Sequence, residues 1–81
     1  GNYTSVYFHD GSFLMLTKTL KHYAEKLEKH GFFRVHKTHL VNLNYVRGYV
    51  KGKNSYVELK DGSNIEVSSR KKQLLVEKLN Y

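Results

Sequence analysis

The sequence contains no cysteine, no proline and no tryptophan, and only seven of its 81 residues are acidic. Without cysteine, the chain can form neither disulfides nor thiolate metal sites, which fits a reducing compartment such as the cytoplasm. No apolar run approaches the roughly 20 residues that cross a bilayer, and the first residues lack a signal-peptide pattern. Repeats, low-complexity tracts and linker-like stretches are also missing. We therefore expect residues 1–81 to form one cytoplasmic domain.

Positive charge, in contrast, is abundant. Fourteen Lys and Arg against seven Asp and Glu give a formal net charge of +7 and a sequence pI near 9.7. A small domain with a pI above about 9 has the electrostatic character of a polyanion binder. A basic surface can also serve solubility alone, so the placement of the charges has to decide between the two interpretations.

Turn-forming pairs between apolar stretches predict a series of β-hairpins. Asp10-Gly11, Gly52-Lys53-Asn54 and Asp61-Gly62 are the expected turns, while the stretch 36–42 fits no clear pattern. The strands are expected over residues 3–9, 12–17, 32–35, 45–50, 56–59 and 65–67.

Two helices interrupt this pattern. Leu20, Tyr23, Ala24 and Leu27 recur at helical spacing, with Thr19 as the expected N-cap and Gly31 as the stop signal. A terminal helix, capped by Ser68 or Ser69, would place Leu75 and Leu79 on one face. The fold class is therefore mainly β (α+β by strict count), with one central and one C-terminal helix.

The start of the terminal helix is the most informative segment for function. Arg70, Lys71 and Lys72 would occupy its first turn, where the positive end of the helix dipole disfavours cations. A bound phosphate would remove this conflict by accepting backbone N–H bonds and neutralising the side chains. The competing interpretation is a solvated charge cluster under mild local strain.

Other chemistry has little support. Four of the five histidines fall between His22 and His39, but no cysteine and few carboxylates accompany them, so no metal site and no cofactor are expected. No phosphate loop, paired carboxylates or nucleophile triad is present, so the chain is not expected to be an enzyme. Five tyrosines could stack on single-stranded bases, although strand residues facing the core are the favoured interpretation. They are Tyr3, Tyr7, Tyr45, Tyr49 and Tyr56.

Three blocks of the sequence form a pattern: Phe33-Arg34-Val35-His36-Lys37-Thr38-His39-Leu40-Val41-Asn42, residues 1–4 and residues 67–72. The first block resembles the central motif of the LytTR-type DNA-binding domain of bacterial transcription regulators. Residues 1–4 resemble the loop that opens its first well-marked hairpin, and residues 67–72 resemble its closing "V-S-R-R" motif. Their order and spacing match over essentially the whole chain.

The resemblance implies an elongated arrangement of small antiparallel β-sheets in which loops, and not a recognition helix, enter the DNA grooves. By position, Tyr3, Lys37 and Arg70 would reach base edges, and Arg70 is the strongest of these because Arg paired with guanine is the commonest specific contact. The implied phosphate contacts are Asn2, Thr4, Thr19, Lys21, Thr38 and Lys71. Lys51, Lys53 and Lys60, near strand ends, could follow the backbone as well.

The resemblance also implies a biological setting. Most members follow a receiver domain that a histidine kinase phosphorylates, and act as dimers on repeated DNA half-sites. Compared with the family, Ser69 stands where a first Arg is common, and one or two strands usually precede the opening loop, so an early sheet is expected to be incomplete. Two alternatives stay open: a protein-interaction or dimerisation module with a solvated basic face, and an RNA-binding domain.

Overall fold

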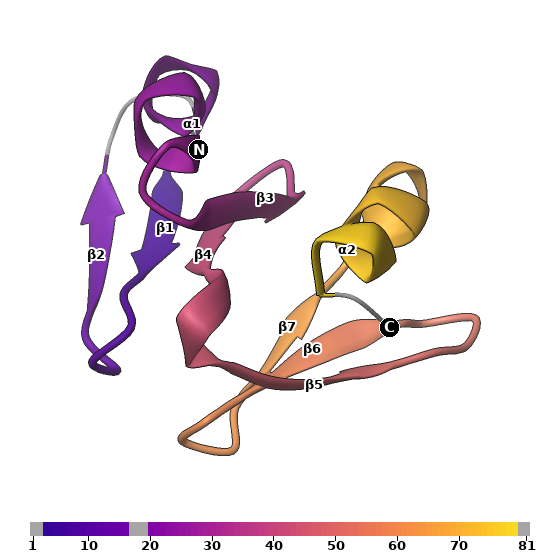
Figure 1. Cartoon of the computed structure of the whole chain (residues 1–81). Helices are drawn as coiled ribbons and strands as arrows, with labels where there is room; N and C mark the ends of the chain where they lie inside the picture. The colour runs from indigo at the N-terminus through magenta and orange to yellow at the C-terminus, as the bar shows by residue number, and fades with distance from the viewer. Residues whose placement is uncertain (1–2, 17–19, 80–81) are drawn as a thin grey trace.

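The computed structural model describes residues 3–16 and 20–79. Within these residues, seven strands form two sheets, and two helices complete the fold (Figure 1). The elements, in chain order, are β1 (Thr4–Tyr7), β2 (Phe13–Leu16), α1 (Leu20–Glu28), β3 (Phe32–His36), β4 (His39–Asn42), a 3₁₀ turn (Leu43–Tyr45), β5 (Val46–Val50), β6 (Tyr56–Leu59), β7 (Asn64–Glu66), a second 3₁₀ turn (Ser69–Lys71) and α2 (Lys72–Leu79). The mainly β architecture with one central and one C-terminal helix is confirmed.

The larger sheet has the strand order β2-β1-β4-β3, and the smaller has β5-β6-β7. All sequential hairpins are antiparallel, as expected, but β1 and β4 pair in parallel, with Val6 opposite Leu40. The ambiguous stretch 36–42 forms a tight hairpin: His36 pairs with His39 across the two-residue turn Lys37-Thr38. This hairpin brings β4 between β1 and β3.

The elongated outline implied by the resemblance is not observed. The molecule measures 30 × 26 × 23 Å and its radius of gyration is 11.6 Å. A compact chain of this length has a radius of gyration of about 12 Å. The two sheets and the helices therefore pack around shared cores instead of lying end to end.

Alternation along β3 and β4 divides the core into two clusters. On one side of the larger sheet, Phe32 and Leu40 pack with Val6 of β1 and with Ala24 of α1. Phe33, Val35 and Val41 point to the other side, where they meet residues of the smaller sheet and of α2. That second cluster also contains Tyr45, Val57, Leu59, Ile65, Val67 and Leu75. Strand β3 is thus packed on both faces, which fixes the position of the turn that follows it.

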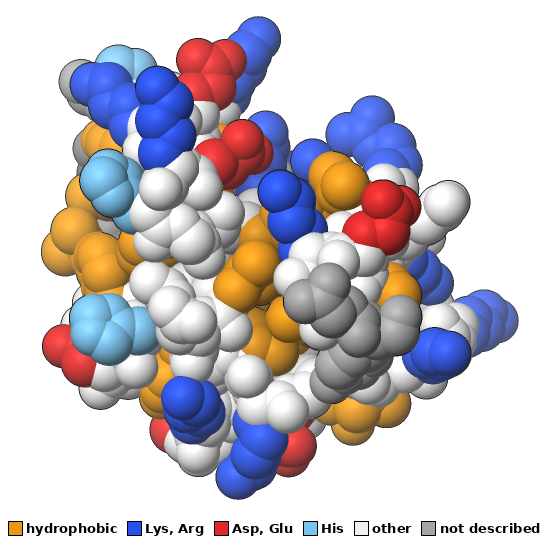
Figure 2. Space-filling view, viewed as in Figure 1, with side chains coloured by type: hydrophobic (Ala, Val, Ile, Leu, Met, Phe, Trp, Pro, Cys, Tyr) orange, Lys and Arg blue, Asp and Glu red, His pale blue; other side chains and the backbone are white. Residues whose placement is uncertain are grey.

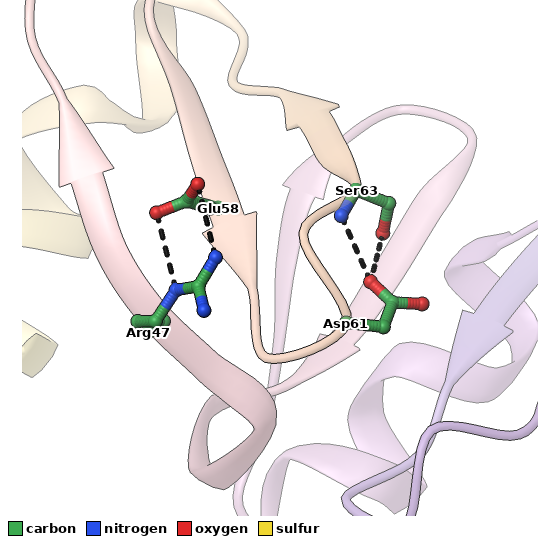
Figure 3. A network of polar contacts seen from close by, with 4 residues as sticks. All are labelled: Arg47, Glu58, Asp61 and Ser63. Atoms are coloured by element: carbon green, nitrogen blue, oxygen red, sulfur yellow. Dashed lines mark hydrogen bonds and ion pairs between the residues drawn. The ribbon is translucent and has the colours of Figure 1, made fainter.

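Polar side chains stabilise the β6–β7 turn and join β5 to β6 in the smaller sheet (Figure 3). Asp61 Oδ1 accepts hydrogen bonds from the Ser63 amide at 2.9 Å and from the Ser63 hydroxyl at 2.6 Å. These bonds hold the pKa of the Asp61 carboxyl below its ordinary value. Arg47 Nη2 and Glu58 Oε2 form an exposed ion pair across β5 and β6 at 3.1 Å, and such a pair contributes about 1 kcal/mol or less.

Candidate nucleic-acid interface

Four cationic side chains from the β3–β4 hairpin and from the segment before α2 line one hollow of the surface. The two backbone segments can be followed in Figure 1. The hollow has a volume of about 290 Å³, and His36 and Ser68 also line it. The four cations are Arg34, Lys37, Arg70 and Lys71. None of the described residues that line this hollow is acidic. We refer to these six residues as the basic hollow.

A β-bulge in β3 brings the two halves of the basic hollow together. The pairing of β3 with β4 shifts register between Arg34 and His36, so that Val35 has no partner in β4. The Val35 carbonyl instead accepts a hydrogen bond of 2.8 Å from the Ser68 amide, while its side chain is fully buried. The closing motif is thereby anchored beside the β3–β4 turn, although the two segments lie over 30 positions apart in the sequence.

The segment after Ser68 differs in detail from the expected helix start. Ser69–Lys71 form a 3₁₀ turn, and the α-helix begins only at Lys72. Ser68 stands at the N-cap position, but its side chain makes no capping hydrogen bond. Its carbonyl accepts from the Lys71 amide at 3.0 Å instead. The helix is therefore preceded by a tight turn that presents Arg70 to solvent.

The cations of this segment have different local roles. Lys72 Nζ donates to the Gly52 carbonyl at 3.2 Å, so this lysine ties α2 to the β5–β6 turn. Lys71 Nζ lies 5.9 Å from the centroid of the Phe33 ring, within the range of a cation–π contact. Arg70 is exposed, and its guanidinium forms no hydrogen bond or ion pair with any residue that the structure describes. Arg70 is thus the cation best placed to take an external anion.

Lys37 occupies the first position of the β3–β4 turn, and its side chain is exposed. Its carbonyl accepts a 3.2 Å hydrogen bond from Arg34 Nη2. Thr38, next in the turn, has its hydroxyl oxygen 3.1 Å from His36 Nδ1 and is only half-exposed. Arg34 was not among the site residues predicted from sequence. Its position in β3 could have indicated an outward-facing cation, but the β-bulge that directs this side chain toward the turn could not have been predicted from sequence.

The remaining predicted contacts are dispersed. Tyr3 is 55% exposed just before β1, whereas Thr4 is 1% exposed, so the Thr4 side chain is not presented to a ligand. Lys21 is exposed on α1; Lys51 and Lys53 flank Gly52, and Lys60 lies at the opposite end of β6. Asn2 lies outside the described residues, and so does Thr19, which is also the expected N-cap of α1. Figure 2 shows Lys and Arg side chains on several sides of the molecule, which fits this spread.

The tyrosines do not form an open stacking surface. Tyr45 is buried, while Tyr7 and Tyr49 are half-buried and pack against the larger core cluster. Tyr56 is also half-buried, which leaves Tyr3 as the exposed member of the five. The interpretation of these residues as strand residues facing the core is confirmed for Tyr7 and Tyr49. Tyr45 is a core residue but belongs to the 3₁₀ turn before β5, and Tyr56 lies in β6 outside the two core clusters.

The histidines group differently from a metal site. His36 and His39 have ring centroids 5.4 Å apart, and Glu66 Oε1 lies 3.7 Å from His36 Nε2. Burial, and secondarily the nearby His36, lowers the pKa of His39. Within residues 3–16 and 20–79, no group of three or more His, Asp or Glu is placed to hold a metal ion. The same residues include no helix long and apolar enough to span a membrane.

Comparison with known proteins gives one match. The family model of the LytTr DNA-binding domain matches residues 1–80, which is essentially the whole chain. Neither the curated proteins nor the solved structures gave a match. Together with the basic hollow formed by the central and closing motifs, this match establishes that the chain belongs to the LytTR family of DNA-binding domains.

Proposed function

We propose that this domain reads the sequence of double-stranded DNA with side chains from separate loops. Arg70 before α2 and Lys37 in the β3–β4 turn contact base edges, and Tyr3 before β1 adds a third contact. The observation that carries the proposal is the basic hollow, in which four cations gather without an acidic lining residue. Such a cluster is unfavourable in the free protein and becomes favourable when phosphates neutralise it.

Two kinds of contact follow from the arrangement. Lys71 at the hollow is suited to a phosphate contact, and so are four exposed lysines elsewhere on the surface, Lys21, Lys51, Lys53 and Lys60. Phosphate contacts fix register and orientation but do not encode sequence. Arg70 can form the bidentate pair with guanine O6 and N7, which is worth roughly 1–3 kcal/mol of discrimination. Thr38 contributes less than expected from sequence, because its hydroxyl already forms a 3.1 Å hydrogen bond with His36 Nδ1 and the residue is only half-exposed.

The domain then serves as the DNA-binding output of a bacterial transcription regulator in the cytoplasm. Family membership supports a regulator that responds to an upstream receiver domain and its histidine kinase. Dimerisation would place two domains on repeated half-sites and raise the effective concentration of the second contact. A single domain would bind weakly, with strong salt dependence, because phosphate contacts release counterions.

Fluorescence anisotropy with three ligands tests this proposal: a duplex selected for binding, a random duplex and single-stranded RNA. Arg70→Ala should weaken binding to the selected duplex by roughly 1–3 kcal/mol and binding to random duplex much less. Lys29→Ala is the matched control, because it removes one exposed positive charge just after α1, outside the basic hollow. Titrations at two salt concentrations separate base readout from the phosphate contribution.

Other outcomes would point to other functions. The three ligands could bind with equal affinity, and Arg70→Ala and Lys29→Ala could cause the same small loss of affinity. In that case the basic hollow would be a general electrostatic surface that does not read bases. Preference for the single strand would favour the RNA-binding alternative. Failure to bind any nucleic acid would favour the protein-interaction alternative.

A further inference from the structure

The same kind of side chain to backbone hydrogen bond closes several turns of this chain. At three places, an Asp or Asn side-chain oxygen accepts a hydrogen bond from the backbone amide two residues later. Ser12 N donates to Asp10, Asn44 N to Asn42 and Ser63 N to Asp61, each at 2.9 Å; the last of these is drawn in Figure 3. These are Asx turns, and each fixes the backbone between its two residues.

The β3–β4 turn repeats the same pattern with a histidine. Thr38 N donates to His36 Nδ1 at 3.2 Å, again across two positions. An Nδ1 that accepts a hydrogen bond carries no proton, so the neutral ring has its proton on Nε2. Nε2 lies 3.7 Å from Glu66 Oε1 of β7, and His39 of β4 lies beside the ring. The second ring nitrogen thus offers a cross-sheet contact, which an Asp or Asn side chain could not make while closing the turn.

The peptide group between Lys37 and Thr38 is held at both ends. Arg34 Nη2 donates to its carbonyl oxygen, and His36 Nδ1 accepts from its N–H. Holding one peptide plane at both polar atoms fixes the ψ angle of Lys37, and therefore the direction in which the Lys37 side chain leaves the backbone. The neighbouring strands are already fixed by packing, since Val35 and Leu40 are fully buried.

From this geometry we infer that His36 is a positioning residue for Lys37: its Nδ1 atom closes the β3–β4 turn and sets the orientation in which Lys37 meets DNA. The inference rests on the proposed function of Lys37. His36 itself needs no contact with the nucleic acid. Its contribution is to order the turn in the free protein, so that the free energy of binding does not include the entropic cost of ordering the turn.

Substitutions that separate the acceptor from the ring test the inference. His36→Phe keeps a ring but removes Nδ1, and should weaken binding to the selected duplex roughly 5- to 30-fold, the cost of ordering one residue on binding. His36→Asn restores an acceptor in the Asx geometry and should recover most of the affinity, although it removes the Glu66 contact. If Asn binds as weakly as Phe, Nδ1 is not the responsible atom and the inference fails.

A double-mutant cycle with Lys37→Ala shows whether His36 acts through Lys37. In the Lys37→Ala background, His36→Phe should have little further effect; a full additive loss would overturn the inference. The failure of the proposed function looks different: Lys37→Ala and Arg70→Ala would then leave binding to the selected duplex unchanged. Urea unfolding of each variant separates loss of affinity from loss of folded protein.

A measurement on the unmodified domain does not depend on the variants folding. The ¹⁵N chemical shifts of the His36 ring at pH 7.5 should show an unprotonated Nδ1 and a protonated Nε2, and the Thr38 amide should exchange slowly with solvent. Slow exchange together with an unprotonated Nδ1 supports the inference. A proton on Nδ1, or a Thr38 amide that exchanges as fast as an unstructured one, overturns it.

Discussion

Leu75 connects the stability of this domain to the position of its basic hollow. It is fully buried in the larger core cluster, beside β3 and the smaller sheet, and α2 extends from the 3₁₀ turn that contains Arg70. Its neighbour Leu74 has the same side chain but is 44% exposed. Truncating each to alanine removes the same atoms from two different environments.

The expected magnitudes differ several-fold. Leu75→Ala should cost about 2–5 kcal/mol, because it removes buried methyl groups and leaves a cavity. A domain of this length has a free energy of unfolding of roughly 4–12 kcal/mol in total. Leu74→Ala should cost about 1 kcal/mol or less, since alanine is an excellent helix former and little buried surface is lost. With a urea m-value of about 1 kcal/mol/M, the Leu75→Ala midpoint should fall by about 2 M or more.

Urea unfolding followed by circular dichroism measures both variants directly. Because m-values report the surface exposed on unfolding, similar m-values would show that the comparison is between similar folded states. Equal midpoints for Leu74→Ala and Leu75→Ala would refute the reasoning, because they would mean that α2 does not pack on the sheets through Leu75. A larger loss at Leu74 would place the buried face of α2 elsewhere.

Two further predictions concern a histidine and a glycine. Folding lowers the pKa of His39 below its ordinary value of 6.5, mainly through burial, so its contribution to stability is complete above pH 6.5 and is lost as the pH falls through the lowered pKa. Urea midpoints should therefore fall between pH 7.5 and 5.5 more steeply for the wild type than for His39→Gln; parallel curves would contradict this. Gly11 and Gly62 both have positive φ, at 92° and 91°, but a Cβ on Gly11 would lie 2.9 Å from Tyr45 Oη, whereas one on Gly62 has open space. Gly62→Ala should cost about 1–2 kcal/mol and Gly11→Ala more, and the reverse order in thermal unfolding would exclude the Tyr45 contact.

The hairpins and helices were predictable because their causes are local. Asp-Gly pairs mark the turns after β1 and β6, and the helical spacing from Leu20 to Leu27 matches α1. Residues 36–42 could not be assigned, since the usual turn residues are missing there and a histidine takes the role of Asp or Asn. Lys37 and Arg70 entered the candidate site through two sequence motifs, and nothing local in either motif indicated that they would share one hollow.

The sequence by itself determined the mainly β class, the basic character and the two motifs, because alternation, turn chemistry and charge are properties of short segments. Tertiary structure decided the parallel pairing of β1 with β4, the burial of Thr4 and the compact outline. It also decided the β-bulge at Val35. The carbonyl of this residue accepts a hydrogen bond from the Ser68 amide, and Val35 has no pairing partner in β4. These features depend on contacts between residues far apart in the chain, where each polar group finds its partner only after the cores have packed.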